Sequence, residues 1–292
     1  MKILILGGNG MLGHQLCMTL SRHNVSATVR RGTDKTLKLS QIFGTHFIQT
    51  NDITDSDQLE RLMDDVNPDV VINGCGVVKQ HGNRLSDTEY HMLNSIFPWR
   101  LATRCIERSI RLVHISSDCV FDGLIGNYSE TITKNSKDIY GMSKSLGEVT
   151  GIGILTLRTS IIGFEISSST HGLLEWFVDE RTEMVEGYTR AFFSGLTTES
   201  LAEEIDFILT STRLSGLYNV GGERISKFDL LNLIGKSLGT NKQIVPSCHI
   251  EIDRSLDSKR YWHQTGRSMP DWNDMTSKLK LNLDKRVFWG IR

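Results

Sequence analysis

The sequence predicts an α/β protein built on a doubly wound parallel sheet, with a small C-terminal lobe. Short apolar runs, typical of buried parallel strands, alternate with segments of helical periodicity through roughly the first half of the chain. The alternation then loosens, and the chain is mostly polar from about Thr240. We therefore expect a large domain over residues 1–160, to which 196–221 return, and a smaller lobe made of 161–195 and 222–292.

Composition narrows the class of protein. With 292 residues and a net charge of −1, the chain is long enough for a large core and shows no basic excess that would favour nucleic acid as a partner. The five cysteines are scattered without a C-x-x-C pair, so we expect no disulfide framework and no metal site. No apolar run approaches the roughly 18 residues of a membrane span, and a strand-like run begins at once. We expect a cytoplasmic protein without a membrane segment or signal peptide.

The first apolar run, Ile3–Leu6, is followed by a glycine turn and then by a helical face. The three glycines are Gly7, Gly10 and Gly13, and Met11 and Leu12 begin the helical face; all five are candidate cofactor contacts. Strand, glycine turn and helix in this order form the fingerprint of a Rossmann-type dinucleotide site. The first glycine permits a tight turn, the second lets a diphosphate approach the backbone, and the third lets helix and strand pack closely.

The end of the second strand, Val25–Val29, indicates which dinucleotide binds. An acidic residue there would hold a ribose 2′-hydroxyl, but the chain carries Arg30 and Arg31. Guanidinium groups suit a 2′-phosphate, so NADPH is the predicted cofactor and NADH stays an alternative. The alternative without a binding role is that one or both arginines are solvated loop residues.

Other candidate cofactor contacts follow later strands. Small residues after the fourth strand would let a cofactor approach the backbone at the carboxyl edge of the sheet, where ligands bind in such folds. The candidates are Asp52 and Ile53 after the third strand, Cys75 and Gly76 after the fourth, and Ile161 after the sixth. In the loop that follows Gly76, Lys79 and His81 could face a substrate, although an ordinary polar loop is an equal alternative for His81.

A predicted helix through Leu93, Phe97 and Leu101 contains Pro98. A proline inside a helix frees the carbonyl four residues earlier, which here belongs to Asn94. Further along the chain, Ser226 and Asp229 form a capping pattern that opens another helix.

Ser117 follows the fifth strand, and Tyr140 and Lys144 come 23 and 27 residues later in a segment that reads as helix. The four-residue spacing places the phenol and the ammonium on one helical face. A nearby cation favours the phenolate, so we expect Lys144 to lower the pKa of Tyr140 from about 10. Such a pair suits protonation of an oxygen.

With these motifs in order, the chain resembles the extended short-chain dehydrogenase/reductases. Within them it is most similar to nucleotide-sugar 4-ketoreductases of the dTDP-4-dehydrorhamnose reductase type. The segment Ile115–Gly123 carries this similarity, as do Leu256, Asp257, Gly266, Pro270 and Trp272.

The resemblance implies an enzyme that reduces the C4 ketone of a nucleotide-linked 6-deoxy-4-ketohexose for cell-surface polysaccharide. Tyr140 would protonate the carbonyl oxygen, Ser117 would hydrogen-bond it, and Lys144 would bind the nicotinamide ribose. Asn94 would hold a water near Lys144. The substrate contacts would be Lys79, Asp118, Cys119, His171 and Arg190. A homodimer is left open.

Related activities remain as alternatives. Dehydratases of the family carry an Asp-Glu pair where this chain has Asp118 and Cys119, so dehydration is disfavoured. GDP-fucose synthases epimerise before they reduce, with a cysteine and a histidine at places similar to Cys119 and His171. We favour simple reduction, with Cys119 as a buried space-filling residue. The segment 192–198 lacks the usual Asp-Gln, which leaves the sugar and nucleotide open, a UDP-linked N-acetylated sugar included. A non-catalytic partner subunit of methionine adenosyltransferase also resembles these reductases.

Overall fold

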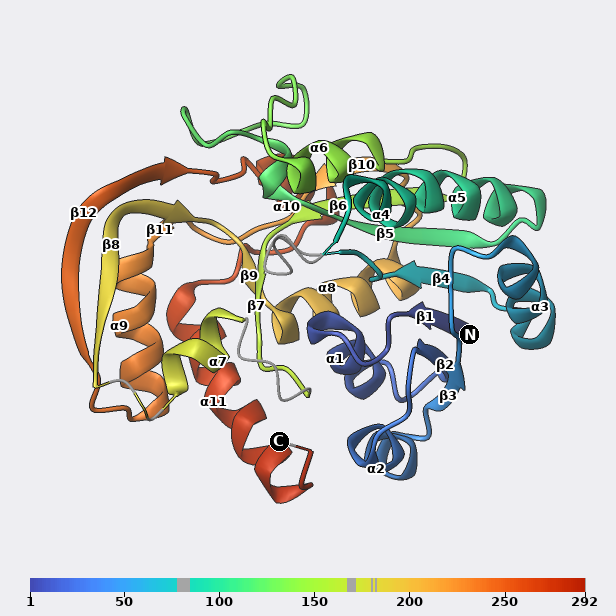
Figure 1. Ribbon diagram of the computed structural model, residues 1–292, viewed down its shortest axis with the longest axis horizontal. Helices are drawn as coiled ribbons and strands as arrows, with labels where there is room; N and C mark the ends of the chain where they lie inside the picture. The colour runs from blue at the N-terminus through green and yellow to red at the C-terminus, as the bar shows by residue number, and fades with distance from the viewer. Residues whose placement is uncertain (78–84, 167–171, 180, 182, 292) are drawn as a thin grey trace.

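The computed structural model describes residues 1–77, 85–166, 172–179, 181 and 183–291. Its central sheet has the strand order β10-β6-β5-β4-β1-β2-β3, and each neighbouring pair is parallel. These strands are β1 (Lys2–Leu6), β2 (Asn24–Val29), β3 (His46–Gln49), β4 (Val70–Asn73), β5 (Arg111–Ser117), β6 (Ile154–Thr159) and β10 (Gly216–Asn219). The order runs both ways from β1, which confirms the predicted doubly wound sheet (Figure 1).

Helices cover both faces of this sheet because its strands are apolar on both sides. In β1, Ile3 and Ile5 belong to one core, and Leu4 and Leu6 belong to a second core on the opposite face. The first core includes α1 (Met11–Thr19) and α8 (Thr198–Ser211), and the second includes α3 (Ser56–Val66) and α5 (Phe97–Glu107). The carboxyl ends of the strands are left for loops.

A three-stranded sheet of order β11-β8-β12 lies to one side of the main sheet, with α9 against it (Figure 1). Its strands are β8 (Met184–Phe193), β11 (Ile225–Ser226) and β12 (Gln243–Asp253), and β7 (Ile161–Ile162) pairs with β9 (Leu196–Thr197). The remaining helices are α2 (Asp34–Phe43), α4 (Asp87–His91), α6 (Ile139–Leu146), α7 (Leu173–Val178), α9 (Lys227–Leu238), α10 (Lys259–Thr265) and α11 (Trp272–Phe288). The division of the chain into two domains stays a prediction. Over the described ranges, no helix is both long and apolar enough to cross a bilayer.

Strands β8 and β12 were not predicted, although they are longer than any strand of the main sheet. β12 is an edge strand, largely exposed, and contains Pro246. An edge strand tolerates proline and polar residues because one of its sides forms no ladder. The tail therefore reads as polar loop even though it is regular structure.

Pro98 lies inside a continuous helical segment, as expected. Helix α4 passes into a π-helical turn, Met92–Ile96, and then into α5, where Pro98 stands in the first turn. The missing proline N–H is tolerated at that position. The turn is closed by the Phe97 amide, which donates to the Met92 carbonyl. Such π-turns are common at functional sites, and this one carries Asn94.

The last helix, α11, reaches beyond the three-stranded sheet to α1. Its fully buried Arg286 donates to Gln15 Oε1 at 3.0 Å and to the Phe164 carbonyl at 3.2 Å. Asn282 accepts from Arg286 and donates to the same Gln15 oxygen at 3.0 Å. The C-terminal segment, expected as part of the smaller lobe, therefore also supports the helix that follows the glycine turn.

Candidate active site

The glycine turn after β1 has the geometry of an anion cradle. Gly7 has a φ of +87°, which favours glycine, and the Gly10 amide donates to the Gly7 carbonyl at 3.0 Å. A Cβ on Gly13 would lie 1.9 Å from the same oxygen, so only glycine lets α1 pack this close. Gly10 caps α1 without a side-chain hydrogen bond. The first-turn N–H groups of α1 are thus left to a ligand such as a diphosphate.

The ends of β4 and β2 lie on the two sides of this turn, because both strands pair with β1. Cys75 Sγ lies 3.2 Å from the place that a Cβ of Gly7 would take. Burial raises the pKa of the Cys75 thiol to about 12, and the charges of Arg30 and Lys144 oppose this rise. Arg30 and Arg31 are both exposed. The charge of Arg30, at the end of β2, therefore reaches Cys75 in the predicted cofactor site. Arg30 and Arg31 fit a phosphorylated dinucleotide.

Three further predicted cofactor contacts are engaged in local structure. The Asp52 carboxylate accepts from the amide and the hydroxyl of Thr54 at 2.9 and 2.7 Å, which forms a tight turn after β3. Ile53 packs against the core shared with α3 and α5. Ile161 pairs with Leu196 in the two-stranded sheet. Their contact with a cofactor stays a prediction.

Ser117 and Tyr140 come together because α6 packs closely against the turn after β5. A Cβ on Gly141 would lie 2.1 Å from the Cys119 carbonyl, so glycine is needed where helix and turn meet. The Ser117 hydroxyl lies close enough to the Tyr140 phenol to influence its pKa. Burial raises the pKa of Tyr140, the Cys119 thiol adds to the rise, and the Ser117 hydroxyl opposes it. The phenol is therefore held in its protonated form.

Lys144 points back at the sheet from one turn further along α6. Its ammonium donates to the Ile115 carbonyl at 2.7 Å and lies 3.9 Å from the place that a Cβ of Gly76 would take. Burial lowers the pKa of Lys144 to about 8, opposed by the charge of Glu148. The expected lowering of the Tyr140 pKa is thus not found, because burial is the largest influence on the pKa of both groups.

Asn94 holds the loop that leaves β4. Its Oδ1 accepts from the Val77 amide at 2.9 Å, and its Nδ2 donates to the Val77 carbonyl and to Ser143 Oγ, both at 3.1 Å. Its backbone carbonyl would lie 1.8 Å from a Cβ on Gly147, which places the π-turn directly against the end of α6. The side chain is therefore occupied in joining three segments, and a bound water near Lys144 stays a prediction.

A buried ion pair behind the catalytic motif was missed by the sequence reasoning. Glu148 receives two hydrogen bonds from Arg158, both at 2.8 Å, and one from Ser116 Oγ at 2.8 Å. Lys134 adds an ion pair at 3.1 Å. Burial alone would raise the pKa of Glu148, but Arg158, Lys134 and Ser116 hold it below its ordinary value. The signal was present as a single arginine in the otherwise uncharged strand β6.

The predicted substrate residues have different surroundings. Asp118 is buried, and burial raises the pKa of its carboxyl, opposed by Arg254 and by a 3.1 Å hydrogen bond from Ser117. Burial also raises the pKa of the Cys119 thiol to about 12, with the charge of Asp118 adding to it. Arg190 is exposed and paired with Glu251 at 2.6 Å. Lys79, His81 and His171 lie outside the described residues.

Two cations that directly follow strands of the three-stranded sheet lie near the turn after Ser117, and they were not among the predicted residues. Arg254 Nε donates to the Phe121 carbonyl at 2.9 Å. Lys227, at the start of α9, lies close enough for the charges of Asp118 and Cys119 to act on it. Ser226 marks this helix start in the sequence, but nothing in the local pattern indicates that the next residue faces the sheet edge.

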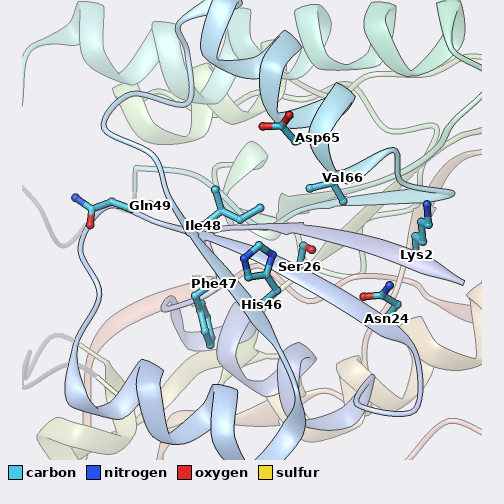
Figure 2. Close-up of a pocket in the computed structure, with 9 residues that line it drawn as sticks. All are labelled: Lys2, Asn24, Ser26, His46, Phe47, Ile48, Gln49, Asp65 and Val66. Atoms are coloured by element: carbon cyan, nitrogen blue, oxygen red, sulfur yellow. The ribbon is translucent and has the colours of Figure 1, made fainter.

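A separate hollow of about 590 Å³ lies at the β3 edge of the main sheet (Figure 2). It is lined by Lys2, Asn24, Ser26, His46, Phe47, Ile48, Gln49, Asp65 and Val66. These residues come from β1 to β3 and the end of α3, and none belongs to the predicted site. In open α/β sheets ligands bind beyond the carboxyl ends of the strands, so the candidate active site is the cluster around Ser117 and Tyr140.

Comparison with known proteins shows the family to which the chain belongs. Residues 1–261 match the family model described as the RmlD substrate binding domain. The chain belongs to this family. A stretch of 151 residues is 29% identical to dTDP-4-dehydrorhamnose reductase of Aggregatibacter actinomycetemcomitans, over 50% of this chain and 45% of that relative. The chain thus spans about half the length of this curated relative. The resemblance to these reductases predicted from the sequence is confirmed.

Solved structures of the same type share the fold over nearly the whole chain. A hypothetical dTDP-4-dehydrorhamnose reductase from Sulfolobus tokodaii is 27% identical with a TM-score of 0.76, over 94% of this chain and 98% of that one. The dTDP-4-dehydrorhamnose reductase of Bacillus anthracis, solved in complex with NADP, is 19% identical with a TM-score of 0.75, over 96% of this chain and 98% of that one.

Proposed function

We propose that this protein uses NADPH to reduce the C4 ketone of a nucleotide-linked 6-deoxy-4-ketohexose, for cell-surface polysaccharide. The observation that carries the proposal is the closeness of Ser117 and Tyr140 where α6 packs on the turn after β5, with Lys144 one turn away and the glycine turn at the same sheet edge. Membership of the RmlD family supports the reaction type. Arg30 and Arg31, and the NADP bound to the Bacillus anthracis relative, support the cofactor. A cytosolic homodimer stays a prediction.

The chemistry of the proposal follows from the protonation states. NADPH, when bound, supplies the hydride that adds to C4. Tyr140 donates its phenol proton to the carbonyl oxygen, which becomes the alcohol, and Ser117 holds that oxygen. The raised pKa of Tyr140 keeps the proton on the phenol until it is needed. The Lys144 pKa of about 8 leaves most of this side chain charged at neutral pH, where it favours the phenolate that forms.

The two alternatives find no support in the geometry. An epimerase of the GDP-fucose synthase type would need a thiolate base, but burial and Asp118 raise the pKa of Cys119 to about 12. A non-catalytic subunit would have no need of Ser117 beside Tyr140.

The test is a panel of dTDP-, UDP- and GDP-linked 4-ketosugars with NADPH, followed by absorbance and by NMR of the product. We expect consumption of NADPH with at least one ketosugar and a new C4 alcohol. Tight NADPH binding without turnover of any ketosugar, together with co-purification of a synthetase, would establish the regulatory alternative instead.

A further inference from the structure

Lys227 is a cation whose contact among the described residues is an aromatic ring. It opens α9, and its ammonium lies 4.1 Å from the centroid of the Phe193 ring in β8. The side chain is half-buried. Within the described part of the chain it has neither a hydrogen-bond acceptor nor an ion pair. An ammonium that is partly removed from water is costly unless something else accepts its N–H groups.

The strands around Lys227 bring it to the catalytic turn. β11 pairs with β8 so that Ser226 lies opposite Phe192, and on the other side Asp253 of β12 also lies opposite Phe192. The next residue, Arg254, donates to the Phe121 carbonyl at 2.9 Å. This end of the three-stranded sheet therefore meets the turn that begins at Ser117.

The electrostatic contacts agree with this placement. Burial lowers the pKa of Lys227 to about 8, and the charges of Asp118 and Cys119 oppose the decrease. These are the two residues that follow Ser117. The ammonium thus lies near the turn that begins at Ser117.

The pair of groups at this place favours a neutral, hydroxylated ring. Lys227 needs an acceptor, and the buried Asp118 carboxyl would repel a carboxylate substituent when ionised. A sugar hydroxyl accepts a hydrogen bond and carries no charge. The ring neighbours of C4 are C3, which can bear a hydroxyl, and C5, which bears the C6 carbon and the ring oxygen.

We propose that Lys227 is a substrate-binding residue that donates a hydrogen bond to the hydroxyl on C3, beside the ketone. The protein then selects nucleotide-linked 4-ketosugars with a C3 hydroxyl over their 3-deoxy analogues. This inference rests on the proposed function and names a determinant of its specificity. A charged donor to a substrate hydroxyl contributes about 10- to 100-fold in affinity.

The experiment compares Lys227→Met with the wild type on a 4-ketosugar and its 3-deoxy analogue, with NADPH. Methionine keeps an apolar stem over Phe193 and removes the donor. We expect kcat/KM to fall about 10- to 100-fold for the hydroxylated substrate and less than about 3-fold for the 3-deoxy one. Lys227→Arg should restore part of the loss. NADPH affinity and melting temperature serve as controls for folding.

Arg224→Met is the matched control. Arg224 lies two residues before the helix cap, 3.2 Å from the centroid of the Phe192 ring, but is exposed and paired with Asp253 at 2.7 Å. We expect no change for either substrate. An equal loss on both substrates in Lys227→Met, or no loss on either, would overturn the inference.

Failure of the proposed function would be distinguishable from failure of this inference. If the wild type binds NADPH but reduces no ketosugar, the function is wrong. The Lys227 contact can then be measured by calorimetry with nucleotide sugars that carry or lack the C3 hydroxyl. A weaker affinity of Lys227→Met for the hydroxylated one alone would still support the contact, and equal affinities would refute it.

Discussion

Glu148→Gln removes the negative charge from the ion pair that lies behind the catalytic motif. The Glu148 and Arg158 side chains are 1% and 2% exposed, so the arginine would keep a buried charge without its partner. Breaking a buried pair in this way costs about 3–5 kcal/mol. With an unfolding entropy of about 2.1 cal/mol/K per residue, the 292 residues give a melting temperature lower by roughly 5–8 °C.

The same change should alter the pH profile of activity. Glu148 opposes the lowering of the Lys144 pKa, which is about 8 in the wild type. Without that charge the Lys144 pKa falls further, so we expect the loss of kcat with rising pH to begin at a lower pH in Glu148→Gln. The assay is ketosugar reduction measured from about pH 6 to 9, with NADPH binding followed at each pH.

The stability difference should itself depend on pH. The folded-state pKa of Glu148 lies below its ordinary value, for which about 4.3 is typical of an unfolded chain. Its contribution is therefore present above the unfolded pKa and is lost as the pH falls through the folded pKa. The melting temperatures of wild type and variant should differ fully at pH 7 and begin to converge as the pH falls below about 4.3.

The control is Glu60→Gln on the surface. Glu60 pairs with Arg104 and Arg108, both at 2.5 Å, but its side chain is 32% exposed. Exposed pairs contribute about 0–1 kcal/mol, so we expect a shift of at most about 2 °C. Equal shifts for the two variants, or a Glu148→Gln protein that melts with the wild type, would refute the argument from burial.

Three further outcomes follow from the site. Tyr140→Phe should lower kcat by roughly 100-fold or more with NADPH affinity within a few-fold of wild type, and near-normal turnover would exclude Tyr140 as proton donor. The KM for NADPH should be lower than the KM for NADH, and the difference between the two should shrink when Arg30 and Arg31 are replaced by Ala. A wild-type preference for NADH would show that the two arginines do not bind the cofactor. Turnover in D2O of a ketosugar already in its final configuration should leave no deuterium at C3 or C5, whereas deuterium that is lost in Cys119→Ser would show epimerisation.

The sheet and the glycine turn could be predicted because their signals are local. A strand such as Ile3–Leu6, buried on both faces, reads as a continuous apolar run, and the spacing from Gly7 to Gly13 lies within one turn and the start of one helix. Ser117 and Tyr140 could be placed together because each lies at the end of a recognisable element. The structure brings the two residues together where α6 packs on the turn after β5, and their catalytic roles stay predictions.

The remaining features depend on contacts between distant segments. The partner of Glu148 lies in another strand, and Lys227 gains its position only because β8 joins β11 and β12. The spacing of apolar residues along the sequence does not indicate which distant segments pair. The pKa of Tyr140 was expected in the wrong direction for the same reason: burial depends on all the surrounding elements, whereas the spacing to Lys144 concerns one helix. Lys79 and His171 lie outside the described residues and stay predictions.

Buried hydrogen bonds join the last helix, α11, to α1, the helix that follows the glycine turn. Gln15 and Arg286 are 271 residues apart, so their hydrogen bond closes almost the largest loop that this sequence can form. The entropy cost of closure grows only slowly with loop length, by about 0.6 kcal/mol per doubling. The cost of closing this loop is therefore moderate. The helix that presents its N–H groups to the predicted phosphate thus depends on the far end of the chain for buried hydrogen bonds, and we expect a change in the last helix to alter dinucleotide binding.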